Sequence, residues 1–124
     1  MVAGMYRIAR HLKRQFQVYQ ARQVSDLYLP KIRSNELLAD DQAYIRSAIE
    51  QVRSIDGYIH LSPETKILDF GCGQGRFAIG LLHQETALGH YCGIDTDIYA
   101  IKWAQRWIQR FHPNFDFIHV NAYH

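Results

Sequence analysis

The sequence predicts an α/β protein whose parallel sheet is flanked by helices, and three observations support this prediction. In the second half of the chain, short apolar runs typical of strands alternate with helical patterns. One of these runs, 66–70, ends in a glycine-rich turn that leads directly into a helix. Strands separated by helices of this length pair in parallel through right-handed crossovers. We therefore expect a ligand to bind beyond the carboxyl ends of these strands.

The N-terminal half is predicted to be helical. Residues 5–29 read as an amphipathic helix that Pro30 closes. Its apolar face carries Met5, Ile8, Leu12, Phe16 and Tyr19. Its other face carries Arg7, Arg10, Lys13, Arg14 and Arg22. We interpret this basic face as a solvated surface. The alternative is a patch that binds an acidic substrate or RNA.

A second helix is expected to begin at Asp40 or Asp41, because either side chain can act as an N-cap. Its apolar stripe comprises Tyr44, Ile45, Ala48, Ile49, Val52 and Ile55. Gly57 is the expected C′ residue, since glycine readily takes the left-handed conformation that ends helices. The first 62 residues are therefore predicted to form an N-terminal helical segment.

The second half is predicted to alternate strands and helices. In order, these are strand 66–70, helix 75–88 with Gly89 as its stop, strand 91–94, a helix capped by Asp97, and strand 115–120 after Pro113. The helix after Asp97 is expected to face the core with Ile98, Ile101, Ala104 and Ile108. Its residues Trp103 and Trp107 are interpreted as packing residues and not as a stacking site for a base.

Polar and flexible residues follow the predicted strands at one edge of the sheet. Gly71, Gly73 and Gly75 come directly after the first strand, and glycines let the backbone turn sharply and let a ligand lie against it. Asp95 follows the second strand and Asn121 follows the third. The three strand ends meet at the same edge of a parallel sheet, so we predict one crevice there.

Two common nucleotide sites are disfavoured by the loop. The dinucleotide fingerprint requires a third glycine at the position of Arg76, and a P-loop requires Gly-Lys followed by Ser or Thr. Cys72 is interpreted as a small loop residue and not as a nucleophile, because no motif places a base beside it. The seven histidines show no metal-ligand spacing, so no metal site is predicted.

Two motifs in the second half of the chain resemble those of a known family. Residues 69–75, Asp-Phe-Gly-Cys-Gly-Gln-Gly, are similar to the first motif of class I S-adenosylmethionine-dependent methyltransferases, and residues 93–97 resemble their second motif. The resemblance starts at Lys66. It implies a Rossmann-like fold in which 63–124 form a partial cofactor-binding domain. That domain stops after its third strand, whereas the sheet of the family has seven strands.

The resemblance also implies roles for individual residues. The loop backbone would lie against the methionine and ribose of the cofactor, and Asp95 would accept hydrogen bonds from the ribose hydroxyls. Ile94 and Thr96 would flank the ribose or adenine, and Asn121 stands where the family often has an aspartate that faces adenine. The implied cofactor-binding residues are Asp69, Gly71, Cys72, Gly73, Gly75, Asp95, Thr96 and Asn121. No catalytic residue is assigned.

The function that this resemblance implies is methyl transfer from S-adenosylmethionine to an unidentified acceptor, expected to be a small molecule and not a nucleic acid or a protein. Two alternatives remain: a non-catalytic binding or assembly module, and an NAD-dependent oxidoreductase. The chain resembles a fragment of a longer enzyme and is expected to be inactive by itself. The open edge of strand 66–70 is expected to promote self-association.

Composition adds the remaining expectations. A chain of 124 residues with 48% hydrophobic and 21% charged residues is sufficient for one small folded domain. Its net charge of +2 is too small to indicate nucleic acid by itself. No apolar run is long enough to span a bilayer, and no signal-peptide pattern is present. The two cysteines fit a reducing compartment. We therefore expect a cytoplasmic protein with no membrane partner.

Overall fold

The computed structural model describes residues 2–33 and 40–121. The elements are α1 (Val2–Val18), β1 (Ala21–Val24), β2 (Leu27–Pro30), α2 (Asp41–Ile59), β3 (Lys66–Phe70), α3 (Arg76–His83), β4 (His90–Asp95), α4 (Ile98–Trp107), the short 3-10 helix η2 (Gln109–Phe111) and β5 (Phe115–His119).

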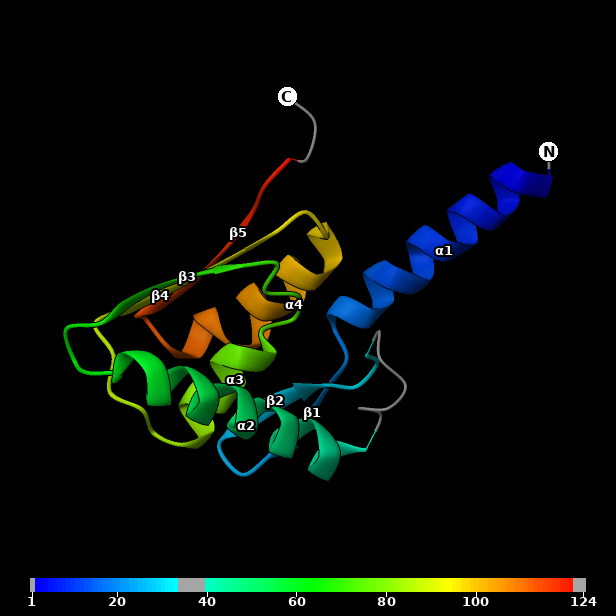
Figure 1. The fold of residues 1–124 in the computed structure, drawn as a ribbon. Coiled ribbons are helices and arrows are strands. Elements are labelled where there is room, and N and C mark those ends of the chain that lie inside the picture. Colours follow the sequence, from blue (N-terminus) through cyan, green and yellow to red (C-terminus); the bar gives the residue numbers. More distant parts are fainter. Residues whose placement is uncertain (1, 34–39, 122–124) are drawn as a thin grey trace.

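The second half forms the predicted parallel sheet. Its strands lie in chain order, β3-β4-β5, with Ile67 opposite Tyr91 and Tyr91 opposite Phe115. Helices α2, α3 and α4 cover one face of this sheet (Figure 1). Leu68, Phe70 and Ile118 are exposed. The α/β fold class is therefore confirmed, and strand 66–70 is correct to the residue.

Strand β3 lies at an edge of the sheet. Among residues 2–33 and 40–121, β4 is its only hydrogen-bonded neighbour. The expected open edge is therefore present in the described part of the chain. The exposed side chains of Leu68 and Phe70 belong to this edge strand, so a row of unpaired backbone groups coincides with apolar surface.

Residues 19–29 do not continue the first helix, so that prediction is wrong. Strands β1 and β2 form an antiparallel hairpin in which Val24 lies opposite Leu27, around a turn at Ser25 and Asp26. The indole Nε1–H groups of Trp107 and Trp103 each donate 2.9 Å hydrogen bonds, to the carbonyls of Val18 and Gln20 respectively. These bonds satisfy carbonyls at the end of α1 and redirect the chain toward the body.

The ends of two other helices also differ from prediction. Gly57 lies inside α2, which ends instead at His60 in the left-handed conformation (φ 53°). The Asp56 carboxylate accepts the N–H of Leu61 at 2.7 Å and stabilises that turn. Helix α3 ends at His83, before residue 88, and Gly89 donates its N–H to the Thr65 carbonyl. Gly89 therefore packs against the turn before β3 and does not stop a helix.

The two predicted N-caps form. Asp40 accepts the N–H of Gln42 at the start of α2, and Asp97 accepts the N–H groups of Tyr99 and Ala100 at the start of α4. On α4, Ile101 and Ala104 are buried, as is Ile108 just beyond it, whereas Ile98 is only partly buried. The α2 stripe is confirmed at Tyr44, Ile45, Ala48 and Val52, but Ile55 is exposed.

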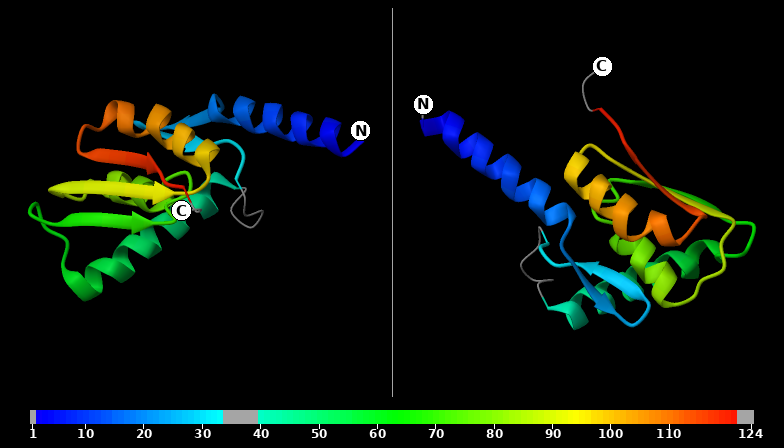
Figure 2. Two further views of the ribbon diagram at one scale, coloured as in Figure 1. Left: turned by 90° about the horizontal axis from the view of Figure 1, so that it is seen from above. Right: turned by 180° about the vertical axis from the view of Figure 1, so that it is seen from behind.

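The N-terminal half shares its core with the sheet. Leu29, Tyr44 and Val52 belong to the same buried cluster as Tyr91 and Phe117. Helices α2 and α3 approach so closely that a Cβ on Gly80 would lie 2.6 Å from the Ala48 carbonyl oxygen. Helix α1 differs, because its N-terminal part extends away from the body (Figures 1 and 2). The division of the chain at residue 62 remains a prediction.

Candidate functional site

The glycine loop between β3 and α3 has the conformation that its sequence predicts. Gly71, Gly73 and Gly75 have φ values of 72°, 57° and 91°, which L side chains rarely adopt. Apart from the glycine itself and its two chain neighbours, no described residue has a heavy atom within 4 Å of a Cβ placed on Gly71 or Gly73. On Gly75, a Cβ would lie 2.7 Å from Cδ1 of Ile108 and 3.2 Å from the Phe117 ring. Gly75 therefore serves helix–sheet packing, whereas Gly71 and Gly73 border open space.

Asp95 lies beside this loop, as the convergence of strand ends predicts. Its Oδ2 accepts the N–H of Gly73 at 2.8 Å, and its Oδ1 accepts the N–H of Asp97 at 2.8 Å. A carboxylate has about four lone-pair positions, so each oxygen can accept one more hydrogen bond. Asp95 is thus an oriented, partly buried acceptor at the carboxyl edge of the sheet.

The N–H groups of the loop are largely engaged within the protein. Gly71 and Cys72 both donate to the Ile94 carbonyl, at 2.8 and 3.1 Å, and Gly75 donates to the Cys72 carbonyl at 3.0 Å. Loops that hold a pyrophosphate present such N–H groups to the ligand. This loop instead directs the N–H groups of Gly71, Cys72 and Gly75 into its own turn, so these three are not presented to a phosphate.

Arg76 departs from the dinucleotide fingerprint. It occupies the position of the third glycine in the dinucleotide fingerprint, where glycine would permit close helix–strand packing. Its guanidinium donates a 2.6 Å hydrogen bond to Oγ of Ser47 on α2. Arg76 therefore ties α3 to α2 and is directed toward that helix.

Cys72 is buried beneath the loop. Its thiol contacts the Gly73 carbonyl at 3.5 Å, and a Cβ on Gly93 would lie 2.8 Å from its Sγ. Burial raises the pKa of this thiol to about 12, and the charges of Asp69 and Asp95 add to the effect. The thiol stays protonated at neutral pH, which agrees with its interpretation as a structural residue.

Asp69 lies within β3, one residue before the end of the strand. Its Oδ2 accepts a 2.6 Å hydrogen bond from the Tyr91 hydroxyl. Burial raises the pKa of Asp69, the Tyr91 bond opposes that rise, and the nearby Asp95 charge adds to it. Asp69 lines a hollow of about 330 Å³ between β3 and α2, together with Ile55, Ile67, Phe77 and their neighbours. It does not line the cavity at Gly73.

Thr96 and Asn121 lie at the same sheet edge as Asp95. The Thr96 carbonyl contacts Nε2 of His119 at 3.1 Å, and Thr96 itself is exposed. The N–H of Val120 donates to the Asp95 carbonyl at 3.0 Å, which places the exposed Asn121 one residue further along. His119 is not among the site residues predicted from the sequence.

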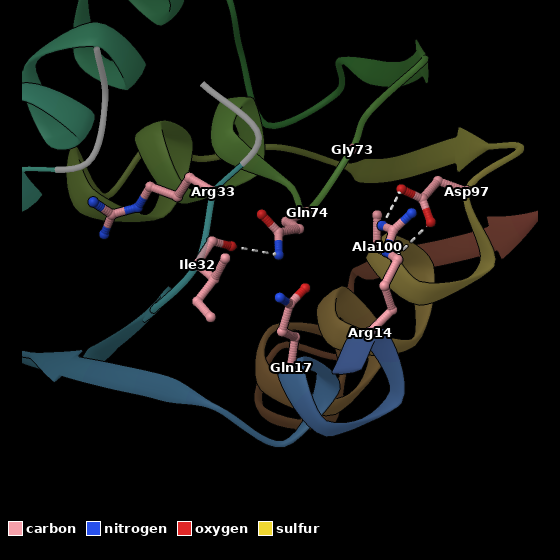
Figure 3. Close-up of a pocket in the computed structure, with 8 residues that line it drawn as sticks. All are labelled: Arg14, Gln17, Ile32, Arg33, Gly73, Gln74, Asp97 and Ala100. Carbon is pink, nitrogen blue, oxygen red and sulfur yellow. Dashed lines mark hydrogen bonds and ion pairs between the residues drawn. The ribbon is translucent and has the colours of Figure 1, made fainter. Parts of the chain in front are cut away.

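A cavity of about 310 Å³ adjoins the loop on the side of the N-terminal half (Figure 3). Its lining residues are Arg14, Gln17, Ile32, Arg33, Gly73, Gln74, Asp97 and Ala100. The Gln74 amide donates to the Ile32 carbonyl at 3.2 Å and links the loop to the segment after β2. The sequence did not predict that this lining includes the four residues that precede the sheet, Arg14, Gln17, Ile32 and Arg33. Their spacing in the chain does not indicate which part of the protein they contact.

Within residues 2–33 and 40–121, no group of His, Cys, Asp and Glu side chains is arranged to hold a metal ion. In the same residues, no helix is both long and apolar enough to cross a membrane.

The three-strand parallel sheet, the glycine loop and the oriented acidic residue define a partial Rossmann-like fold. A family model described as "Methyltransferase domain" matches residues 67–124. This match confirms the resemblance to methyltransferases that the motifs of the same segment carry.

Among solved structures, YjhP from E. coli is similar to this chain, with 24% sequence identity and a TM-score of 0.46. The match covers 59% of this chain and 30% of the YjhP chain.

Proposed function

We propose that this chain binds S-adenosylmethionine and takes part in methyl transfer to a small-molecule acceptor. One observation carries the proposal: Gly71 and Gly73 leave open space beside Asp95, whose two carboxylate oxygens are held by the N–H groups of Gly73 and Asp97. The matching family model over 67–124 supports the same activity.

The residues present fit this cofactor. Its ribose carries two neighbouring hydroxyls, and Asp95 has one remaining acceptor position on each of two oxygens. The backbone at Gly71 and Gly73 has no side chain that would block close approach. Asn121 follows β5 at the same edge and can offer its side-chain carbonyl to an exocyclic amine such as that of adenine.

The bound cofactor supplies the reactive methyl group on a sulfonium. The protein supplies position and charge. Asp95 is oriented before any ligand arrives, because two backbone donors hold it. The carboxylate of Asp69, fixed by Tyr91, lies near enough to Asp95 for their charges to interact, and we propose that it supports the amino end of the cofactor through water.

The dimensions of the neighbouring cavity support a small acceptor. A volume of about 310 Å³ lies at the lower end of the range for small-molecule pockets, which run from roughly 300 to 1,000 Å³. Arg14, Gln17 and Ile32 wall this cavity on the side of the N-terminal half. This wall favours a compact ligand over a nucleic acid or a protein.

Calorimetric titration with S-adenosylhomocysteine and with NAD tests the cofactor assignment. We expect binding of S-adenosylhomocysteine and none of NAD, because the loop donors that a pyrophosphate needs are engaged. Binding of NAD alone would refute the proposal. Incubation with radiolabelled S-adenosylmethionine and fractionated small metabolites then separates a transferase from a module that only binds the cofactor.

A further inference from the structure

Helix α1 presents its apolar side to solvent. Met5, Ile8, Leu12 and Phe16 recur at three- and four-residue spacing, so they share one face of the helix. They are 69%, 63%, 58% and 65% exposed. Along Val2–Val18, all of it described, Val18 is the only buried residue. Monomeric proteins rarely expose a contiguous apolar stripe of this kind, and such stripes mark interaction sites.

The polar side of α1 contacts the rest of the protein. Arg14 forms a 2.6 Å ion pair with Asp97, and His11 is hydrogen-bonded to the Tyr99 hydroxyl. Val18 packs at the end of the same face, since 11, 14 and 18 are also three and four residues apart. The apolar stripe therefore faces away from α4, and the N-terminal part of α1 extends beyond the body (Figures 1 and 2).

The distribution of charge along the chain indicates which kind of partner this stripe binds. Residues 2–25 contain five basic side chains and no acidic one, whereas the rest of the chain contains nine basic and twelve acidic residues. The positive charge is thus concentrated in and just after α1. Tyr19 continues the apolar face just beyond α1 and is 61% exposed. Tyrosine is enriched at membrane–water interfaces.

We propose that α1 binds the surface of an anionic lipid membrane, lying in the plane of the interface with its apolar stripe toward the acyl chains. Arg7, Arg10 and Lys13, on the other side of α1, would then attract the anionic headgroups, whereas Arg14 is paired with Asp97. A second copy of the chain is a poorer occupant, because two copies of α1 would bring eight basic residues together, and α1 itself contains no acidic one. Nucleic acid would match the charge and leave the apolar stripe exposed. This inference is independent of the proposed methyl transfer.

Co-sedimentation of the full 124-residue protein with vesicles tests the proposal. We compare phosphatidylcholine vesicles with and without phosphatidylglycerol, and expect binding only to the anionic mixture, weakening as salt is added. Leu12→Glu should weaken binding by at least about thirtyfold, because it removes a leucine side chain that the acyl chains would bury and also adds a charge. Ala3→Glu is the matched control, since it adds the same charge to an exposed position on the opposite side of α1 from the stripe. It should cost only about fivefold, as should Arg10→Gln.

The outcomes are distinct. Equal losses for Leu12→Glu and Ala3→Glu would overturn the role of the apolar stripe, and equal binding to both vesicle types would overturn the role of charge. Sedimentation-velocity runs without lipid complete the test. A dimer that Leu12→Glu dissociates, with no vesicle binding, would assign α1 to a second copy and refute the proposal. Absence of binding by a folded monomer would refute it as well.

Discussion

The Tyr91 hydroxyl donates a 2.6 Å hydrogen bond to Oδ2 of Asp69, joining two neighbouring strands beside the glycine loop. Tyr91 is buried, and Asp69 is partly withdrawn from water. Burial raises the pKa of Asp69 above its ordinary value of 3.8, against the effect of the Tyr91 bond. The carboxylate is therefore held in place at the cost of a less favourable ionisation.

This arrangement predicts a pH dependence of stability. Because the pKa of Asp69 is higher in the folded protein, its contribution is full below pH 3.8 and is lost as the pH rises through the folded pKa. Asp69→Asn removes the titrating carboxyl group, so the variant does not lose stability through this ionisation. The free energy of unfolding of the variant should therefore improve relative to wild type as the pH rises from about 4 through the folded pKa of Asp69. Urea titrations at each pH measure it, with Glu50→Gln on the exposed face of α2 as control. A constant difference across this range would contradict the prediction.

Asp95→Ala is predicted to weaken S-adenosylhomocysteine binding. Hydrogen bonds to a charged group are worth about 1.5–3 kcal/mol, which corresponds to roughly a tenfold to hundredfold increase in Kd. Calorimetry on the folded variant measures the change. Asp116→Asn is a suitable control, because this half-exposed carboxylate pairs with His90 near the start of β5. Unchanged affinity in Asp95→Ala would show that Asp95 is not a ligand.

Alanine substitutions at three glycines should differ in sign and size. Gly75→Ala combines a positive φ with contacts at 2.7 and 3.2 Å, so we expect it to destabilise the fold by about 2–4 kcal/mol. Gly71→Ala has the strain without the overlap and should cost about 1 kcal/mol. Gly57→Ala lies inside α2 in open space and should stabilise by about 0.5–1 kcal/mol. Denaturant titration tests the order. A cost for Gly71→Ala equal to that of Gly75→Ala would exclude packing at Gly75.

The Arg14–Asp97 ion pair predicts unequal effects of its two partners. Both side chains are about a third or more exposed, so Arg14→Gln should cost at most about 1 kcal/mol. Asp97→Ala also removes the N-cap of α4, and the loss of such a cap typically costs about 1 kcal/mol of stability in addition. Thermal unfolding of both variants gives the comparison. A larger loss for Arg14→Gln would contradict the prediction, because Asp97→Ala removes the same ion pair and the cap as well.

The exposed edge of β3 predicts self-association. Leu68 and Phe70 are 56% and 75% exposed on a strand whose described neighbour lies on one side only. Leu68→Lys places a charge on this strand and should shift the chain toward monomer in sedimentation velocity, as charged edges do in natural sheets. Lys66→Arg keeps the charge of the strand and should have no effect. A monomeric wild-type chain at high concentration would contradict this prediction.

Local chemistry explains what could be predicted from the sequence. Strand 66–70, the glycine loop and the Asp97 cap depend on residues within a few positions of one another, and all three have the expected form. Parallel pairing then brings Asp95 to Gly73, because consecutive strand ends must meet at one edge. The motif of the loop was also sufficient to identify the methyltransferase domain.

The tertiary structure decided the features whose partners are distant in the chain. The amphipathic pattern of residues 5–29 is compatible with one long helix, but Trp103 and Trp107 bond to the carbonyls of Gln20 and Val18 and end it early. Likewise, Arg14 reaches Asp97 across 83 positions, which makes α1 a wall of the cavity and turns its apolar stripe outward. Periodicity shows which residues share a face of a helix. Only the packing of the other elements determines whether that face meets the core or the solvent.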